Sequence, residues 1–289
     1  MSLARTEYYR TGLLSVRHVA CRSAEKGAGD VETQAADTLV LPLRGLFMEH
    51  FSRSAQVLAE PNVALVFPAG LSYRVSHPVS TEDDCLAIEF SEGCFGDVLE
   101  SMALPGAPLA SCSLLSPSAM AARNLLWRRL AQRHAGPLEV EETALSLLSY
   151  AMRRAREDRA RLLLSTRMIR QIETARVVLL LHPERKWSLS ALAHAVGCSP
   201  FHLARMFRER VGVTLHRYHL QTRLARALDL LLETDRDLAA VALELGFSSH
   251  SHFTASFRQA VGISPSRLRE VASSRIAAEI RKILIAHLS

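Results

Sequence analysis

Two groups of polar side chains, about 50 residues apart, have the types and the spacing needed to hydrogen-bond to a nucleic acid. The first follows Ser199-Pro200, a strong helix start because serine caps the first amides and proline fits the first turn. One face of that helix presents Phe201, Ala204, Arg205 and Arg208, at i, i+3, i+4 and i+7. Guanidinium groups donate paired hydrogen bonds to guanine and to phosphate, so this face suits the major groove of DNA.

The second group has the same layout. Either Ser248 or Ser249 is the expected N-cap of its helix. The inner side of this helix is apolar, with Phe253, Phe257 and Val261, and the outer side carries His250, Ser251, Thr254, Ala255 and Arg258. The sequence therefore predicts two similar polar helix faces on one chain.

The elements that position these faces are duplicated as well. One set of positions recurs 49 residues later, where Leu189, Ala193, Gly197 and Ser199 become Leu238, Ala242, Gly246 and Ser248. Another set recurs 50 residues later, where Phe207, Arg208 and Gly212 become Phe257, Arg258 and Gly262. A small residue four positions before a glycine is what two helices crossing closely at a tight turn require. The pattern predicts helix-turn-helix units at about 188–210 and 237–260, and disfavours the alternative of a plain all-α bundle.

The other helices of this part are predicted from caps and apolar spacing. Ser188 is a plausible N-cap for the first unit, and Leu203, Met206 and Phe207 form the expected inner side of its second helix. A helix from Leu215 to about Glu233 joins the units. If that helix is rigid, both polar faces should reach successive major-groove segments, about 34 Å apart on B-DNA.

Charge is divided unevenly along the 289 residues. Residues 1–150 hold 12 Lys and Arg against 17 Asp and Glu, whereas residues 166–270 hold 15 against 9. This division is typical of a nucleic-acid module joined to a module of another kind. The chain has neither an apolar run of about 18 residues nor a signal-like start, so we expect no membrane contact and a cytoplasmic, nucleoid-associated location.

Residues 1–115 are predicted to be rich in strands. Apolar runs at 39–51, 62–67 and 85–90 are separated by proline and glycine turns, which is typical of a sandwich or a barrel. From 116 to 165 the period is helical, with helices at 118–134 and 138–159, and a helix at 168–181 opens the domain at 166–271. Residues 272–289 are expected to add an amphipathic helix. We expect an α+β multidomain chain.

The helix at 138–159 has an apolar stripe formed by Val140, Ala144, Leu147, Leu148 and Ala151 or Met152. Two interpretations stay open. The stripe packs on the strand domain of its own chain, or it forms the subunit contact of a homodimer.

Motifs for catalysis and for metal binding are missing from the sequence. It contains no G-x-S-x-G, P-loop or H-E-x-x-H motif, so we expect no enzyme. The five cysteines, Cys21, Cys85, Cys94, Cys112 and Cys198, form no C-x-x-C pair, and we expect most of them to be buried. A redox pair of Cys85 and Cys94 would need exposure and a lowered thiol pKa.

Residues from about Met168 to Val271 resemble the DNA-binding domain of the AraC/XylS family of bacterial transcription regulators. The segments that carry the resemblance are Gly197-Cys-Ser-Pro-Phe-His-Leu-Ala-Arg-Met-Phe207, Arg223-Leu-Ala-Arg-Ala-Leu228 and Gly246-Phe247 through to Pro265. This resemblance implies seven helices with two helix-turn-helix motifs that act at promoters, more often as an activator than as a repressor.

The N-terminal part resembles, more loosely, the cupin-like β-barrel sensor of the same family, through Pro61-Asn62, Phe67-Pro-Ala-Gly70, Tyr73 to Pro78 and Cys85 to Phe90. Cupins that act as enzymes bind a metal through a close histidine pair and a carboxylate, and no H-x-H occurs here. His50 and His77 would face one interior only if the fold brought them together, so we expect no metal.

The resemblance also assigns site residues. It implies base contacts by Phe201, Ala204, Arg205, His250, Ser251, Thr254 and Ala255. The two alanines cannot donate hydrogen bonds where relatives often carry longer polar side chains, so readout falls mainly on Arg205. Phosphate contacts are expected from Ser199, Arg208, Ser249 and Arg258. The alternative for Arg205 and Arg208 is a solvated helix face without a ligand.

Together these observations predict a sequence-specific DNA-binding transcription regulator. Its expected partners are double-stranded DNA, a second copy of the chain, an unknown small-molecule effector and, for an activator, RNA polymerase; no cofactor is expected. One alternative is a cupin-type metalloenzyme or ligand-binding protein whose helical tail is structural. Another is an adaptor that binds proteins. Metal analysis and duplex retention distinguish the three.

Overall fold

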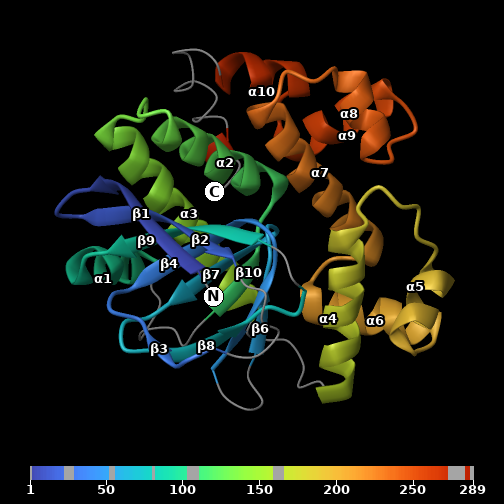
Figure 1. The fold of residues 1–289 in the computed structure, drawn as a ribbon, viewed down its shortest axis with the longest axis horizontal. Coiled ribbons are helices and arrows are strands. Elements are labelled where there is room, and N and C mark those ends of the chain that lie inside the picture. Colours follow the sequence, from blue (N-terminus) through green and yellow to red (C-terminus); the bar gives the residue numbers. More distant parts are fainter. Residues whose placement is uncertain are drawn as a thin grey trace. The chain divides into compact units, whose positions relative to one another are not determined.

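The computed structural model describes residues 2–22, 29–51, 56–79, 82–102, 111–158, 166–272 and 284–286. The chain divides into two units, one formed by Met1–Glu157 with Ala277–Ser289 and the other by Asp158–Ile276. The first unit holds the strands and the second is helical (Figure 1). The predicted α+β organisation is therefore confirmed.

Two antiparallel sheets make up the centre of the N-terminal unit. The larger has the order β1 (Ser2–Arg10), β2 (Leu14–Arg22), β9 (Glu82–Phe90), β4 (Thr38–Arg44), β7 (Val63–Phe67) and β10 (Ser111–Leu114). The smaller has the order β3 (Glu32–Thr33), β8 (Ser72–Ser76), β5 (Phe47–His50) and β6 (Gln56–Ala59). Among the described strands no ladder of hydrogen bonds joins one sheet to the other, so the closed barrel that we expected is replaced by two facing sheets.

The apolar run at 39–51 forms two strands, β4 and β5, and not one. Gly45 turns the chain between them with a φ of +70°, a backbone conformation that residues with a Cβ rarely adopt. A Cβ at this position would also overlap the Glu82 carbonyl and lie 2.7 Å from the Cα of Asp83. The predicted run at 62–67 contains β7 and the run at 85–90 falls within β9, whereas α1 (Glu92–Ser101) was not predicted.

The two helices after β10 are α2 (Pro117–Ala131) and α3 (Pro137–Asp158), close to the predicted bounds. Along α3 the apolar stripe is fully buried, from Val140 through Leu148 to Met152. The Tyr150 hydroxyl accepts a hydrogen bond from the Ser116 amide and donates one to the Leu114 carbonyl. Of the two interpretations of the stripe, packing within the chain is therefore the one observed.

Residues 166–272 form the seven helices that the resemblance implies. They are α4 (Thr166–Leu181), α5 (Leu189–Val196), α6 (Pro200–Val211), α7 (Leu215–Glu233), α8 (Leu238–Glu244), α9 (His250–Val261) and α10 (Pro265–Ala272). The pairs α5–α6 and α8–α9 lie at opposite ends of α7 (Figure 1). Of the helix predicted at 272–289, only Ala272 and residues 284–286 lie within the described residues. No helix in the described part of the chain has the length and apolar character needed to span a bilayer.

Candidate nucleic-acid interface and N-terminal cavity

The sequence repeat is reproduced at the level of backbone hydrogen bonds. In both units a left-handed glycine follows the first helix, Gly197 with φ +71° and Gly246 with φ +75°. The next amide bonds back to the alanine five residues earlier, at 3.0 Å in both units, which is the closing bond of a Schellman motif. The paired alanines, Ala193 and Ala242, are almost fully buried. The small residue and the glycine thus let the second helix begin close to the first.

Serine N-caps start both second helices. The Ser199 hydroxyl accepts from the His202 amide at 3.3 Å, and the Ser249 hydroxyl accepts from the His252 amide at 3.1 Å. The cap of the second unit is therefore Ser249, so the extra residue of the repeat lies in the turn before α9. Each hydroxyl keeps its own hydrogen for a further acceptor, such as a phosphate oxygen.

The inner sides of α6 and α9 are buried as predicted. Leu203, Met206 and Phe207 have no exposed surface, and neither do Phe253, Phe257 and Val261. These six side chains fix the rotation of both helices about their axes. The opposite faces must therefore point away from the core.

The outer face of α6 brings four of the predicted residues to one groove. Phe201, Ala204, Arg205 and Arg208 line it together with residues of the loop that leads into α7. Phe201 is 79% exposed, which is unusual for a phenylalanine, and the Arg205 side chain is 57% exposed. Arg205 lies 3.9 Å from the Glu209 carboxylate, and this long, exposed contact leaves its donors free to turn to another acceptor.

The outer face of α9 is also open to solvent. His250, Ser251, Ala255 and Arg258 are exposed and Thr254 is half-buried. The Thr254 hydroxyl and His250 Nε2 are 3.4 Å apart, one helical turn from each other. All eleven predicted contact residues therefore lie at the surface of the two second helices or at their caps.

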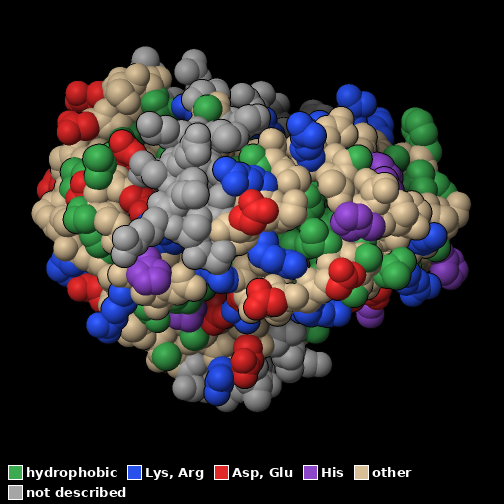
Figure 2. Space-filling view, turned by 90° about the horizontal axis from the view of Figure 1, so that it is seen from above, with side chains coloured by type: hydrophobic (Ala, Val, Ile, Leu, Met, Phe, Trp, Pro, Cys, Tyr) green, Lys and Arg blue, Asp and Glu red, His purple; other side chains and the backbone are tan. Residues whose placement is uncertain are grey.

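The outer faces of α6 and α9 each carry one arginine, Arg208 and Arg258, that forms no ion pair among the described residues. Arginine, lysine and histidine side chains spread over the surface of the C-terminal unit, the right-hand part of Figure 2. Cations that are not neutralised within the chain attract an anionic ligand.

One residue that sequence reasoning did not single out as functional holds the second helix-turn-helix unit in place. Arg223 on α7 donates to the carbonyls of Pro183 at 2.6 Å, Arg185 at 3.2 Å and Gly246 at 3.3 Å. Its guanidinium also lies over the Phe247 ring, 5.8 Å from the centroid. It joins the loop before α5 to the turn between α8 and α9. In the sequence it belongs to the segment Arg223 to Leu228, whose only signal is the family resemblance.

The α6 groove contains further residues that the sequence analysis missed. Thr214 and His216 line it from the loop and the first turn of α7, and Leu189 lines it from the start of α5. Thr214 is the N-cap of α7 and accepts from the Arg217 amide at 3.3 Å. The threonine-capped helix start is the signal that would have placed His216 beside α6.

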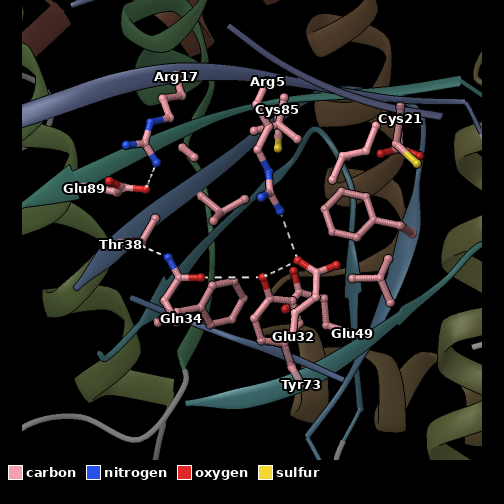
Figure 3. Close-up of a pocket in the computed structure, with 18 of the residues that line it drawn as sticks. Arg5, Arg17, Cys21, Glu32, Gln34, Thr38, Glu49, Tyr73, Cys85 and Glu89 are labelled. Carbon is pink, nitrogen blue, oxygen red and sulfur yellow. Dashed lines mark hydrogen bonds and ion pairs between the residues drawn. The ribbon is translucent and has the colours of Figure 1, made fainter. Parts of the chain in front are cut away.

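A separate cavity of about 380 Å³ lies between the two sheets of the N-terminal unit. Alternate residues of β2 from Arg17 to Cys21, and of β9 from Asp83 to Glu89, line it, as the alternation of side chains along a strand requires. Arg17 and Glu89 lie at one end of this cavity and Cys21 lies at the other (Figure 3). The cavity is thus part of the protein interior with polar groups on its walls.

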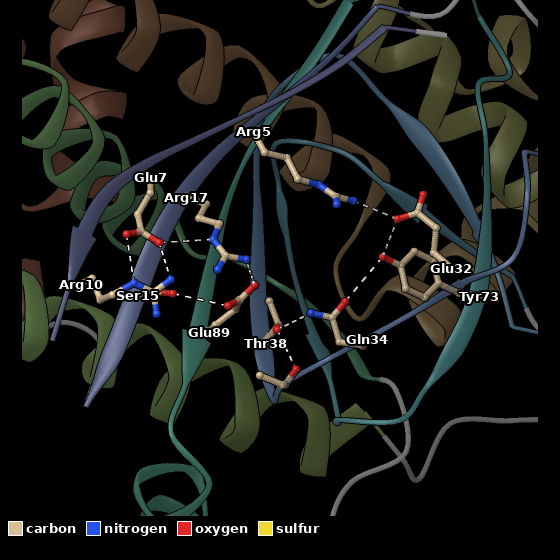
Figure 4. Close-up of polar contacts among 11 residues, drawn as sticks. Arg5, Glu7, Arg10, Ser15, Arg17, Glu32, Gln34, Thr38, Tyr73 and Glu89 are labelled. Carbon is tan, nitrogen blue, oxygen red and sulfur yellow. Dashed lines mark hydrogen bonds and ion pairs between the residues drawn. The ribbon is translucent and has the colours of Figure 1, made fainter. Parts of the chain in front are cut away.

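Polar contacts connect the walls of the cavity. Arg5 pairs with Glu32 at 3.1 Å, the Tyr73 hydroxyl donates to Glu32 at 3.5 Å, and Arg17 pairs with Glu89 (Figure 4). The Glu49 carboxyl is almost fully buried at the same wall. Burial raises the pKa of Glu49 to about 8, with a smaller contribution from the charge of Glu32, so its carboxyl carries a proton at pH 7.

The cysteines fit the expectation of buried thiols in part. Cys21, Cys85 and Cys94 are buried, and Cys112 and Cys198 are half-buried. Burial raises the pKa of Cys85 and of Cys94, which is the opposite of what a reactive pair requires.

Fold and surface together define the C-terminal unit as a tandem helix-turn-helix domain. Comparison with known proteins places that domain in a family. The helix-turn-helix domain family matches residues 192–270. A protein described as "probable transcription factor PqrA", from Proteus vulgaris, is 35% identical over 82 residues, which are 28% of this chain and 67% of that protein. The transcriptional regulator ExsA of Pseudomonas aeruginosa is 32% identical over 35% of this chain and 36% of its own.

A solved structure of a transcriptional regulator with an AraC-type DNA-binding domain, from Chromobacterium violaceum, is 30% identical over 36% of this chain and 94% of that chain, with a TM-score of 0.35. The chain belongs to the AraC family of helix-turn-helix transcription regulators. It spans about a third of the length of the first curated relatives that it matches.

Proposed function

We propose that this protein regulates transcription by binding double-stranded DNA through α6 and α9. The observation that carries the proposal is the duplicated surface. Both helices bury one apolar side completely and expose arginine on the other, and both start at a serine cap. The α7 helix between them has 19 residues and is therefore about 28 Å long. This length is close to the separation of successive major-groove segments, about 34 Å.

The roles proposed for individual residues combine what the family resemblance implies with their exposed positions on α6 and α9. Arg205 reads a guanine edge from the middle of α6, and Phe201 and Ala204 make apolar contacts beside it. On α9 His250, Ser251 and Thr254 supply polar contacts to bases, and Ala255 packs against a thymine methyl. Arg208, Arg258, Ser199 and Ser249 position the phosphates.

The N-terminal unit acts in this proposal as a cupin-like sensor. Its cavity is the candidate site for a small-molecule effector, because paired charges and apolar residues share its walls. Because the α3 stripe is buried, a homodimer would use another surface. The proposed regulator acts in the cytoplasm as an activator that contacts RNA polymerase, and it has no enzymatic activity.

Binding to DNA should weaken steeply as salt rises. Two to four arginines per chain would displace phosphate counterions, so the slope of log affinity against log salt should be about −2 to −4. Between 50 and 200 mM salt the affinity should therefore fall about 15- to 250-fold. The measurement is fluorescence anisotropy of the full chain with a duplex selected from a random library. A flat response to salt would contradict the proposed interface.

Arg205→Ala should weaken binding to the selected duplex by about 1–3 kcal/mol and leave binding to random duplex nearly unchanged, because a base contact carries sequence information. Arg267→Ala is the matched control, since Arg267 is about as exposed but pairs with Glu270 at 3.2 Å on α10. The control should bind both duplexes like the wild type. Equal losses on both duplexes in Arg205→Ala would make Arg205 a phosphate contact instead.

A further inference from the structure

Three side chains with metal-binding donor atoms meet at one end of the N-terminal cavity. Cys21 on β2 and Asp83 on β9 are direct partners in the ladder between those strands, so they point to the same side of the sheet. His77 follows the last residue of β8 in the other sheet. The thiol, the imidazole and the carboxylate offer one donor atom each, and these atoms all lie within 4.8 Å of one another.

The three side chains are buried, and one polar atom each of His77 and Asp83 makes no hydrogen bond within the described residues. Their residues are 5%, 2% and 5% exposed for Cys21, His77 and Asp83. His77 Nε2 lies 2.9 Å from Asp83 Oδ2, yet within the described ranges neither atom takes part in a hydrogen bond. A buried polar atom without a partner costs about 1–3 kcal/mol, so such a pair calls for an explanation.

Burial shifts the pKa of each of the three side chains toward its neutral form. Burial, with a contribution from the charge of Asp84, raises the pKa of Asp83 to about 7. Burial also raises the pKa of Cys21 and lowers the pKa of His77.

The donor set is typical of one class of ion. A thiolate and an imidazole with one carboxylate suit zinc and similar first-row divalent metals, and they do not suit magnesium or calcium. Zinc binds nitrogen and oxygen at about 2.0–2.2 Å and sulfur at about 2.3 Å, so the ligand atoms of one tetrahedral ion lie about 3.3–3.8 Å apart. The observed cluster is within about 1 Å of that spacing.

We propose that Cys21, His77 and Asp83 bind one zinc-class divalent ion at this end of the cavity. The three residues also line the cavity, so a fourth coordination position faces it and takes water or an anionic ligand. His77 follows a strand of the four-stranded sheet, and the other two ligands lie on strands of the six-stranded sheet. The bound ion therefore links the two sheets. No sequence motif indicates this site, since its ligands are 56 and 6 residues apart and no H-x-H is present.

The test uses the full chain without an affinity tag, stripped with a chelator and titrated with Co²⁺ and then with Zn²⁺. We expect one Co²⁺ per chain, with a thiolate-to-cobalt charge-transfer band and the visible bands of a four-coordinate ion, both removed by Zn²⁺. Cys21→Ser, His77→Gln and Asp83→Asn should each weaken binding at least 10-fold.

Two variants serve as matched controls. Cys112→Ser removes a thiol that does not line the cavity, and His50→Gln removes an imidazole that instead bonds the Ser76 hydroxyl at 2.7 Å. Both should bind the metal like the wild type. The site is refuted if wild-type protein shows no charge-transfer band, or if the three ligand variants keep its affinity. The band needs no variant, so it decides the question even if a variant fails to fold. None of these readouts depends on DNA binding.

Discussion

Gly246→Ala should destabilise the C-terminal unit by roughly 3 kcal/mol or more and abolish binding to the selected duplex. Two costs add at this position. A residue with a Cβ at φ +75° loses about 1–2 kcal/mol. The new Cβ would also overlap the Glu184 carbonyl oxygen and lie 2.9 Å from its carbon, and this neighbour is backbone.

The loop that carries Glu184 has little room to move away. Arg223 holds the carbonyls on both sides of Glu184, those of Pro183 and Arg185, as well as the carbonyl of Gly246 itself. His219 holds the Pro183 carbonyl too, at 2.9 Å. A shift that relieved the clash would therefore break charge-assisted hydrogen bonds, which are among the stronger ones in proteins.

Gly197→Ala is the matched control, because Gly197 occupies the same position of the repeat. Its φ is nearly the same, but a Cβ there would meet no atom within 4 Å. It should lose only about 1–2 kcal/mol. The measurement is urea unfolding followed by the fluorescence of Trp187, which lies on the loop beside Glu184, in a Trp127→Phe background. Equal losses in the two variants would show that the clash is relieved and that φ alone matters.

The difference between these two glycines shows what a repeat can predict. Sequence reasoning placed both at tight turns, and the Schellman bonds of Cys198 and Phe247 confirm the shared local structure. It could not tell that one glycine faces solvent and the other faces the backbone of residue 184. The left-handed turn at each glycine is a local requirement, which the sequence encodes directly. The close backbone contact at Gly246 depends on a loop some 60 residues earlier in the chain.

The same limit explains the N-terminal unit. Periodicity located β7, β9, α2 and α3, because each has a regular apolar pattern of its own. It did not separate β4 from β5, since Gly45 interrupts a run that stays apolar on both sides. Neither did it bring Cys21 beside Asp83, because the register of β2 on β9 is set by tertiary packing.

On the helical side, periodicity separates the buried face of α6 and α9 from the exposed one, and the family resemblance then picks the eleven proposed contact residues from the exposed faces and caps. Once Phe207 and Phe257 are assigned to the core, Arg208 and Arg258 must be exposed. Residues outside α6 and α9, such as Arg223 and His216, have no such periodic signal.

Arg123→Ala should lower the free energy of unfolding of the N-terminal unit by about 3–5 kcal/mol, because Arg123 is fully buried and its loss leaves core carbonyls without a donor. From α2 its Nη1 donates to the Pro42 carbonyl on β4 at 2.5 Å and to the Pro61 carbonyl before β7 at 2.7 Å. Water cannot replace these bonds in a packed interior.

Arg123→Lys tests whether charge alone is enough. A lysine keeps the positive charge but lacks the planar fork, so it should recover only part of the lost stability. Arg22→Ala is the control, because its pair with Glu82 is largely exposed and should contribute less than about 1 kcal/mol. Urea unfolding followed by Trp127 in a Trp187→Phe background reports on this unit alone. If Arg123→Ala unfolds within 1 kcal/mol of the Arg22→Ala control, then α2 is held on the sheets by its apolar side chains, and the buried guanidinium contributes little to the stability of the unit.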